Sequence, residues 1–270
     1  EHFGVWRPAA GGECPKARLS QLFDVLNKVT IDALIAPKAE GERSLAEQHC
    51  HHLTETDLVL MDRGYPAFWL FAAIRAQQAH FCARMSLTEW SSVAEFVASG
   101  RQEHLLQLKP GYQARQACQQ RHLSSEPLWV RLLRLEGDQA EPIVLVTSLL
   151  DTNRFPYAQL QDLYLYRWPI ETDYRHIKNR LEVENWTGTT VSAIYQDFHA
   201  TVFTKNLAAL LAQPVQPVVV QLSASRKHPY QINVANLFSK LKDTLIHLFL
   251  AANPLPFLHH LWQQMTRTIE

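Results

Sequence analysis

A short apolar run between two acidic residues most constrains what this chain can fold into. Leu58–Met61 contains no polar residue and is bounded by Asp57 and Asp62. A run of this kind is typical of a strand that is buried on both faces, as in a parallel or mixed sheet covered by helices. The apolar spacing over residues 67–78 predicts a helix, and residues 80–85 predict a second strand. This β-α-β order predicts an α/β sheet with a right-handed crossover.

The segments on either side of this unit have their own periodicities. Two apolar-rich stretches joined at Asn27-Lys28 predict a hairpin. After Pro156 the apolar residues recur at helical spacing. The full expectation is strands at 19–26, 30–36, 129–135 (with an exposed basic side) and 142–150, helices at 40–49, from 156, at 190–211, 234–250 and 257–265, and a linker at 214–220.

Residues 86–141 differ in composition from the rest, because they are rich in Gln and Arg and contain several turn signals. This composition predicts an inserted, mostly β subdomain. The chain is therefore expected to have four parts: a core, first part, at 1–85, a β-rich insertion at 86–141, the second part of the core at 142–212, and a helical C-terminal tail at 213–270.

The overall charge is balanced, with 26 basic and 26 acidic side chains. Whole-chain electrostatics therefore does not point to a nucleic-acid partner. The local distribution differs, since residues 167–180 hold a basic stretch built around Glu171. The hydrophobic content of 47% suffices for a substantial core. Because no apolar run approaches the roughly 20 residues of a membrane span, we expect no membrane partner.

The four cysteines are widely spaced and form no C-x-x-C pair. Reduced thiols in a cytosolic protein are the expected state. The sequence His49-Cys50-His51-His52 looks like a metal-binding tract. Adjacent residues point in different directions, however, and cannot all ligate one ion, so we assign no zinc site here.

Asp62 stands at the carboxyl end of the predicted buried strand, immediately before a loop. In open α/β sheets, ligands bind outside the carboxyl ends of the strands. A carboxylate in this place can hold a hard divalent cation through oxygen. The alternative is that Asp62 merely starts a turn before Gly64, and position alone favours that alternative.

A second group of polar residues recurs at helical spacing. Tyr164, Arg167, Glu171 and Lys178 have offsets of 0, 3, 7 and 14. On one helix these offsets fall within a sector of roughly 60°, and Arg175 falls near it. The alternative is a solvated helix face stabilised by pairs such as Glu171–Arg175.

Pro169 interrupts this pattern, because proline removes a backbone donor and should kink or restart the helix. Glu171 and Lys178 can then share one helix after the break. The placement of Tyr164 and Arg167 relative to that helix stays open.

These residues fit the pattern Y-x2-R-x3-E-x6-K with every spacing correct. The pattern resembles the signature of the insertion-sequence-four family of DDE transposases. The stretch from Leu58–Met61 to Asp62 and Tyr65 resembles the second-aspartate segment of that family, a strand that ends in D-x-G-F/Y. Residues 226–233 also resemble C-terminal segments of the family. The similarity spans nearly the whole chain, in order.

The resemblance implies a ribonuclease-H-like mixed sheet flanked by helices, interrupted by a β insertion. It implies that Asp62 and Glu171 are the second and third catalytic carboxylates. It implies that Tyr164, Arg167 and Lys178 contact DNA phosphates near the cut, and Arg175 is added as a neighbouring cation. The first catalytic aspartate is the departure from the family. Because Asp24 and Asp32 lie on the hairpin that should follow its strand, we expect that aspartate upstream of residue 1.

The implied cofactor is a pair of Mg²⁺ or Mn²⁺ ions, held by Asp62 and Glu171 with the missing aspartate bridging them. The implied partners are double-stranded DNA, as transposon ends and target, and a second copy of the chain in a synaptic complex. The implied location is the bacterial cytoplasm, at the nucleoid. Trp129 and Trp90 are candidates for stacking on an extruded base, although a buried core role is favoured for both.

Two other functions are weighed against strand cleavage and transfer. One is a catalytically inactive transposase fragment that still binds DNA or a partner. The other is a different ribonuclease-H-like nuclease, and the spacing of Tyr164, Arg167, Glu171 and Lys178 argues against it.

Overall fold

A computed structural model describes the chain except for residues 1, 7–13, 137–141 and 182. The chain forms two compact units. The first comprises residues 1–22 and 34–169, and the second comprises residues 23–33 and 170–270. None of the helices in the described residues is long and apolar enough to cross a lipid bilayer.

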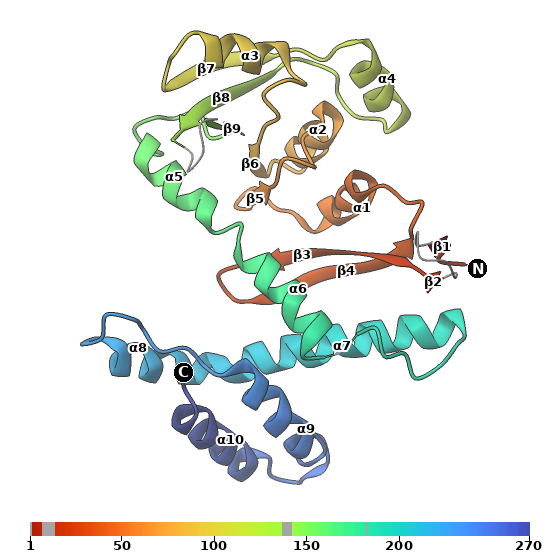
Figure 1. Cartoon of the computed structure of the whole chain (residues 1–270), viewed down its shortest axis with the longest axis vertical. Helices are drawn as coiled ribbons and strands as arrows, with labels where there is room; N and C mark the ends of the chain where they lie inside the picture. The colour runs from red at the N-terminus through yellow and green to blue at the C-terminus, as the bar shows by residue number, and fades with distance from the viewer. Residues whose placement is uncertain (1, 7–13, 137–141, 182) are drawn as a thin grey trace. The chain divides into compact units, whose positions relative to one another are not determined.

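A five-stranded mixed sheet is the centre of the first unit (Figure 1). The strand order is β5-β6-β9-β8-β7, with β5 and β6 parallel and the remaining pairs antiparallel. The mixed α/β sheet predicted from the sequence is therefore confirmed. The strands are β5 (Leu58–Met61), β6 (His80–Arg84), β7 (Glu103–Leu108), β8 (Leu128–Leu135) and β9 (Ile143–Thr147).

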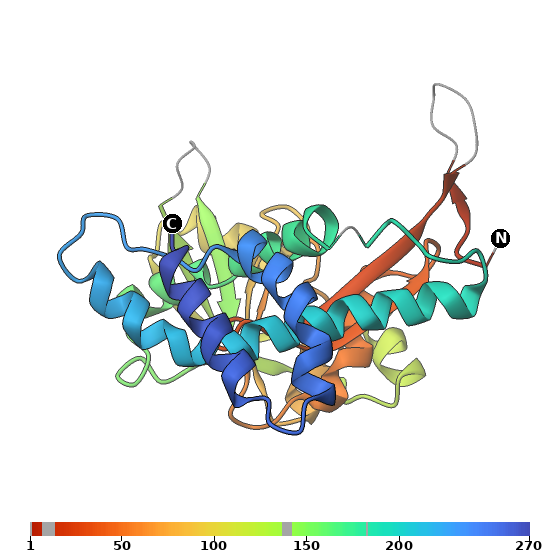
Figure 2. The same ribbon diagram turned by 90° about the horizontal axis from the view of Figure 1, so that it is seen from below.

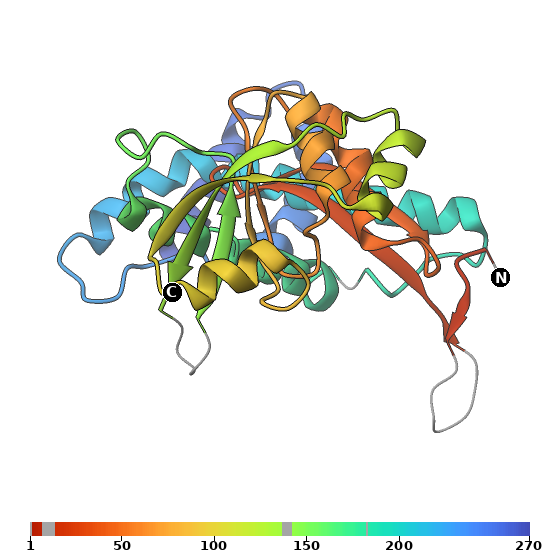
Figure 3. The same ribbon diagram turned by 90° about the horizontal axis from the view of Figure 1, so that it is seen from above.

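Side chains alternate between the two faces of this sheet, as a strand period of two requires. On β6, Phe81 and Ala83 belong to one buried cluster and Cys82 to another. The first cluster is covered by α2, α3 and α4, and the second by α5. Figure 3 shows strands β7–β9 from above with α3, in yellow, lying beside them. These helices are α2 (Phe68–Ala76), α3 (Ser91–Ala98), α4 (Tyr112–Gln120) and α5 (Tyr157–Leu165).

The hairpin predicted around Asn27-Lys28 is present, and its two strands form a separate sheet. Lys28 has a φ of 59°, the left-handed conformation that such a turn requires. Ser20 Oγ lies 3.0 Å from His49 Nε2, so the histidine tract has a partner within the fold. The elements of this region are β1 (Val5–Trp6), β2 (Cys14–Pro15), β3 (Ala17–Asp24), β4 (Val29–Pro37), α1 (Glu42–His49) and the 3-10 turn Cys50–His52.

The prediction that residues 86–141 are mostly β is wrong. This stretch alternates helix and strand, and both of its strands belong to the five-stranded sheet. Val93 and Phe96 have helical spacing and are buried. The Gln- and Arg-rich stretch forms helix α4 because Gln and Arg are good helix formers. The boundaries of the four predicted parts stay a prediction.

The exposed basic side predicted for β8 is also wrong. Arg131 is 1% exposed. Its guanidinium donates to the Glu103 carboxylate on β7 and to the Phe155 carbonyl. The buried charge of Arg131 is tolerated because it is paired with a carboxylate and hydrogen-bonded. Arg131 thereby fixes the chain just before α5.

The second unit is helical, and Figure 2 shows α9 and α10 side by side against α7. Its core contains Ala208, Leu241 and Leu261. The linker predicted at 214–220 is wrong, because Pro214 and Pro217 sit at the first positions of helices, where a missing N–H costs nothing. The helices are α6 (Pro169–Asn179), α7 (Val191–Ala212), the 3-10 turn Gln213–Val215, α8 (Gln216–Ser223), α9 (Val234–Leu250) and α10 (Leu255–Arg267).

Candidate active site

Asp62 follows β5 directly and is exposed at the carboxyl end of that strand. The backbone turns at once, since Tyr65 N donates to Asp62 O at 3.1 Å. Both readings of the sequence are therefore compatible with this position, because Asp62 starts a turn and also presents its carboxylate where α/β sheets bind ligands.

Tyr164 connects α5 to the end of β5. Its hydroxyl donates to the backbone oxygen of Met61 at 3.2 Å, and its side chain is buried. Burial raises the pKa of the Tyr164 phenol well above its ordinary value, the Arg167 charge lowers it, and the Asp62 charge raises it. The last turn of α5 thus lies against the strand end that carries Asp62.

Arg167 lies in the turn after α5. Its guanidinium carbon is 4.3 Å from the centroid of the Trp168 ring and 6.0 Å from that of Tyr164. Trp168 is exposed, so a cation and an aromatic face are presented together. The first unit therefore brings Asp62, Tyr164 and Arg167 to one end of its sheet.

Arg84 is a basic residue at this end that the sequence analysis missed. Met61 is in register with Ala83, so Arg84 on β6 follows the strand pair on the same edge as Asp62. Its charge lowers the pKa of Tyr164, against the larger effect of burial. The signal was available, because Arg84 stands near the end of the strand predicted at 80–85, which follows the Asp62 strand in the β-α-β unit.

Tyr164→Phe should lower the free energy of unfolding by about 1–3 kcal/mol, because Met61 O loses its buried partner. The difference should shrink above pH about 10, where an unfolded tyrosine ionises. The raised pKa keeps the folded phenol protonated, so wild-type stability is present below the unfolded pKa and is lost as the pH rises. Urea melts of both proteins at pH 7 and pH 10.5 measure this. Equal stabilities at pH 7 would contradict the bond.

The signature residues do not lie on one continuous helix. Helix α5 ends at Leu165 and α6 begins at Pro169, as the proline predicted. On α6, Glu171 and Lys178 are two turns apart on the exposed face together with Arg175. The acid in the first turn and the cation in the last turn also suit the helix dipole.

The opposite face of α6 carries a buried ion pair that the sequence analysis did not find. Asp173 Oδ2 lies 2.5 Å from Lys205 Nζ on α7, and the side chains are 8% and 4% exposed. Lys205 also donates to Thr30 Oγ1 on β4. The signal was a lysine in the middle of the apolar helix 190–211, where a charge requires a partner.

Trp129 and Trp90 differ in their surroundings. Trp129 is 56% exposed, so the buried role favoured for it is wrong. Trp129 precedes Arg131, the first residue of β8 that pairs with β9. The end of β8 that carries Trp129 therefore has no β9 strand beside it in the part of the chain that the structure describes. Trp90 packs on the first cluster, with its ring 6.3 Å from that of Phe71, as favoured from the sequence.

The carboxylate of Asp24 is hydrogen-bonded within the hairpin turn. It accepts hydrogen bonds from the backbone of Leu26 and Asn27 and from the Asn27 side chain. Burial raises the pKa of the Asp24 carboxyl, but the three hydrogen bonds together outweigh burial and lower that pKa. Asp24 is thus an acceptor that closes the hairpin turn.

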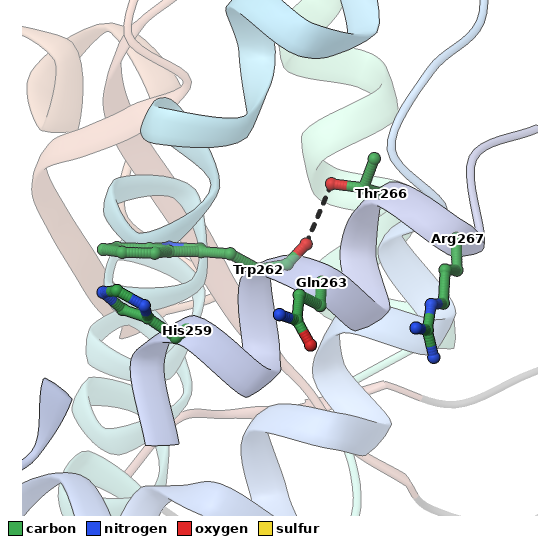
Figure 4. Close-up of a pocket in the computed structure, with 5 residues that line it drawn as sticks. All are labelled: His259, Trp262, Gln263, Thr266 and Arg267. Atoms are coloured by element: carbon green, nitrogen blue, oxygen red, sulfur yellow. Dashed lines mark hydrogen bonds between the residues drawn. The ribbon is translucent and has the colours of Figure 1, made fainter. Parts of the chain in front are cut away.

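A surface hollow of about 390 Å³ lies on α10 in the second unit (Figure 4). His259, Trp262 and Arg267 are among its lining residues. It contains none of the signature residues. In the described residues no group of three His, Cys, Asp or Glu side chains could hold a metal ion. Asp62 belongs to the first unit and Glu171 to the second, and the predicted approach of their carboxylates stays a prediction.

Comparisons with known proteins show which family this chain resembles. Residues 2–207 match the family described as Transposase DDE domain. The chain is also 29% identical over 168 residues to the transposase InsG for insertion sequence element IS4 of Escherichia coli (strain K12). That match covers 62% of this chain and 37% of the relative. The family match extends over most of the chain, and the chain therefore belongs to the transposase DDE domain family.

Proposed function

We propose that this protein is a DNA transposase that cleaves DNA strands at insertion-sequence ends and joins them to a target. One observation supports this most. The hydrogen bond from the Tyr164 hydroxyl to the Met61 backbone oxygen joins two motifs, since these residues are 103 positions apart. Tyr164 and its neighbour Arg167 therefore lie beside the strand end that carries Asp62. A pattern match by chance would not be expected to bring its parts together.

The carboxylates suit a hard divalent cation. Asp62 and Glu171 are both exposed and offer oxygen ligands of the kind that Mg²⁺ and Mn²⁺ prefer. When bound, a pair of metal ions would activate the attacking oxygen and stabilise the leaving oxygen of an in-line displacement at phosphorus. We propose Asp62 and Glu171 as ligands and assign the third carboxylate to sequence preceding Glu1.

The cations would hold the DNA. An arginine suits a bidentate contact with phosphate, which we assign to Arg167. Lys178 and Arg175 would contact neighbouring phosphates from the exposed face of α6. The buried Tyr164 hydroxyl is committed to Met61, so we assign Tyr164 the part of holding the end of β5 rather than a phosphate contact.

The substrates proposed are transposon ends and target DNA, bound by two copies of the protein in the bacterial cytoplasm at the nucleoid. The relative InsG is named as a transposase of an insertion sequence, which supports this choice over another ribonuclease-H-like nuclease. An inactive fragment that only binds DNA is the second candidate. Mg²⁺-dependent nicking of a plasmid that carries the transposon ends, by the full-length protein, tests the proposal against it.

Removing the exposed cations of α6 should weaken DNA binding in a salt-dependent way. The plot of log K for DNA binding against log salt concentration has a negative slope. Each of Arg175→Gln and Lys178→Gln should make this slope less steep by about 1, because one phosphate contact is lost. The matched control is Lys242→Gln on α9, an exposed cation outside the signature. Binding titrations at several salt concentrations measure the slopes. A change of slope in the control alone would refute the assignment.

A further inference from the structure

The packed side of helix α6 combines apolar residues with one buried acid. Its buried residues are Asp173 and Ile177, and Ile170 and Tyr174 are half-buried. Ile170, Tyr174 and Ile177 share one side of the helix, but hydrophobic contact is non-directional and sets the rotation of the helix less sharply than a paired charge does. The orientation of the exposed face that carries Glu171 therefore depends on Asp173 as well as on this apolar side.

The environment of Asp173 is specific in a way that apolar packing is not. Lys205 Nζ, its partner, lies 2.5 Å from the carboxylate and 4.9 Å from the centroid of the Phe23 ring. The same ammonium donates to Thr30 Oγ1. Burial lowers the pKa of Lys205, and the Asp173 charge opposes that shift. A buried ammonium needs a carboxylate beside it, so the helix has one acceptable rotation.

The lysine is itself held in place by its neighbour on α7. Asn206 Oδ1 accepts from the backbone N–H of Thr30 at 2.8 Å, and Asn206 Nδ2 donates to the Thr30 carbonyl at 2.7 Å. This two-point contact fixes the tip of the β3–β4 hairpin against α7. The hairpin tip, α7 and α6 thus form one hydrogen-bonded assembly within the second unit.

We propose that the buried Asp173–Lys205 pair is a positioning device that sets the rotation of α6 and so directs the carboxylate of Glu171. Asp173 lies two residues after Glu171, so a rotation that frees Asp173 from Lys205 also turns Glu171. The roles of Glu171 rest on the proposed function, whereas the rotation of α6 does not.

A double substitution separates this device from ordinary stabilisation. Asp173→Asn alone should lower the melting temperature by roughly 10 °C, because it leaves the Lys205 charge uncompensated. Asp173→Leu with Lys205→Met should melt near the wild type, since an apolar pair of similar volume often replaces a buried ion pair at no loss. It should nevertheless lose about 100-fold in single-turnover nicking at saturating DNA, with the Kd for DNA within about threefold, because a misdirected group slows the chemistry.

A labelling readout measures the rotation without any activity. The variants Glu171→Cys, at an exposed position, and Ile177→Cys, at a buried one, are made in the full-length protein, and the rate of reaction with a charged maleimide is measured. The same protein without the new cysteine supplies the background. With Asp173 and Lys205 in place, Ile177→Cys should react at least tenfold more slowly than Glu171→Cys. The double substitution Asp173→Leu with Lys205→Met should remove most of that protection.

The outcomes are distinguishable. A double variant with wild-type melting, wild-type protection at 177 and wild-type nicking would overturn the positioning role. If protection at 177 falls as expected but the wild-type protein shows no nicking on any substrate, the positioning role stands and the proposed function fails. If only the melting temperature changes in the double variant, the pair is merely stabilising and the inference is wrong.

Discussion

Glu171→Gln should abolish the proposed Mg²⁺-dependent nicking by the full-length protein, with a loss of about 10³-fold or more in rate. Metal-assisted stabilisation of transition-state charge contributes several kcal/mol, and about 4 kcal/mol corresponds to that factor. The glutamine keeps the size of the side chain and the first-turn position on α6 but removes the anionic ligand. DNA affinity should fall little, since the cations that contact phosphate stay in place.

The matched control is Glu184→Gln, which removes an exposed acid from the same unit outside the signature. It should nick at the wild-type rate. Nicking of supercoiled plasmid and DNA binding are measured for both variants with the same preparations. Comparable rates for Glu171→Gln and Glu184→Gln would refute the catalytic assignment of Glu171.

The 270 residues alone should bind DNA but neither cleave nor join it. Only two of the three carboxylates expected of the family have matching positions, and Asp24 is used in a turn. Two like-charged ions repel, so a missing bridging ligand should leave the second ion weakly bound. Binding should persist and weaken as salt rises, because the contacts are to phosphates.

An extended protein that includes the preceding strand and its aspartate should regain nicking, and Glu171→Gln should remove it again. The assay compares the two lengths on the same supercoiled substrate. If the short chain nicks as fast as the extended one and loses activity on Asp24→Asn or Asp32→Asn, the first aspartate has been misplaced and lies on the hairpin.

Local patterns predicted the parts of the fold that depend on neighbours in sequence. The apolar run before Asp62, the helix that follows it and the turn at Lys28 each have a nearby cause. Pro169 marked the start of a new helix for the same reason. The strand before Asp62 and the helix that begins at Pro169 position Asp62, Glu171 and Lys178, so these three residues could be placed on elements in advance.

Long-range pairing could not be predicted in this way. Arg131 looked like an exposed basic residue because its acceptors, Glu103 and Phe155, are 28 and 24 residues away. Asp173 and Lys205 are 32 residues apart, and their pairing depends on how two helices pack. Whether a charged side chain can be buried depends on its partner, and a local sequence pattern does not identify a partner that is distant in sequence.

The hairpin has a consequence for how this chain can be divided. Its tip, residues 23–33, belongs to the second unit, while the chain on both sides belongs to the first. The polypeptide therefore passes from one unit to the other after residues 22, 33 and 169. A single proteolytic cut or truncation at residue 169 cannot release two intact pieces, because the hairpin tip would stay behind without α7. Recombinant exchange of the helical half between relatives would have to carry the eleven-residue tip with it, so the two segments should be inherited together.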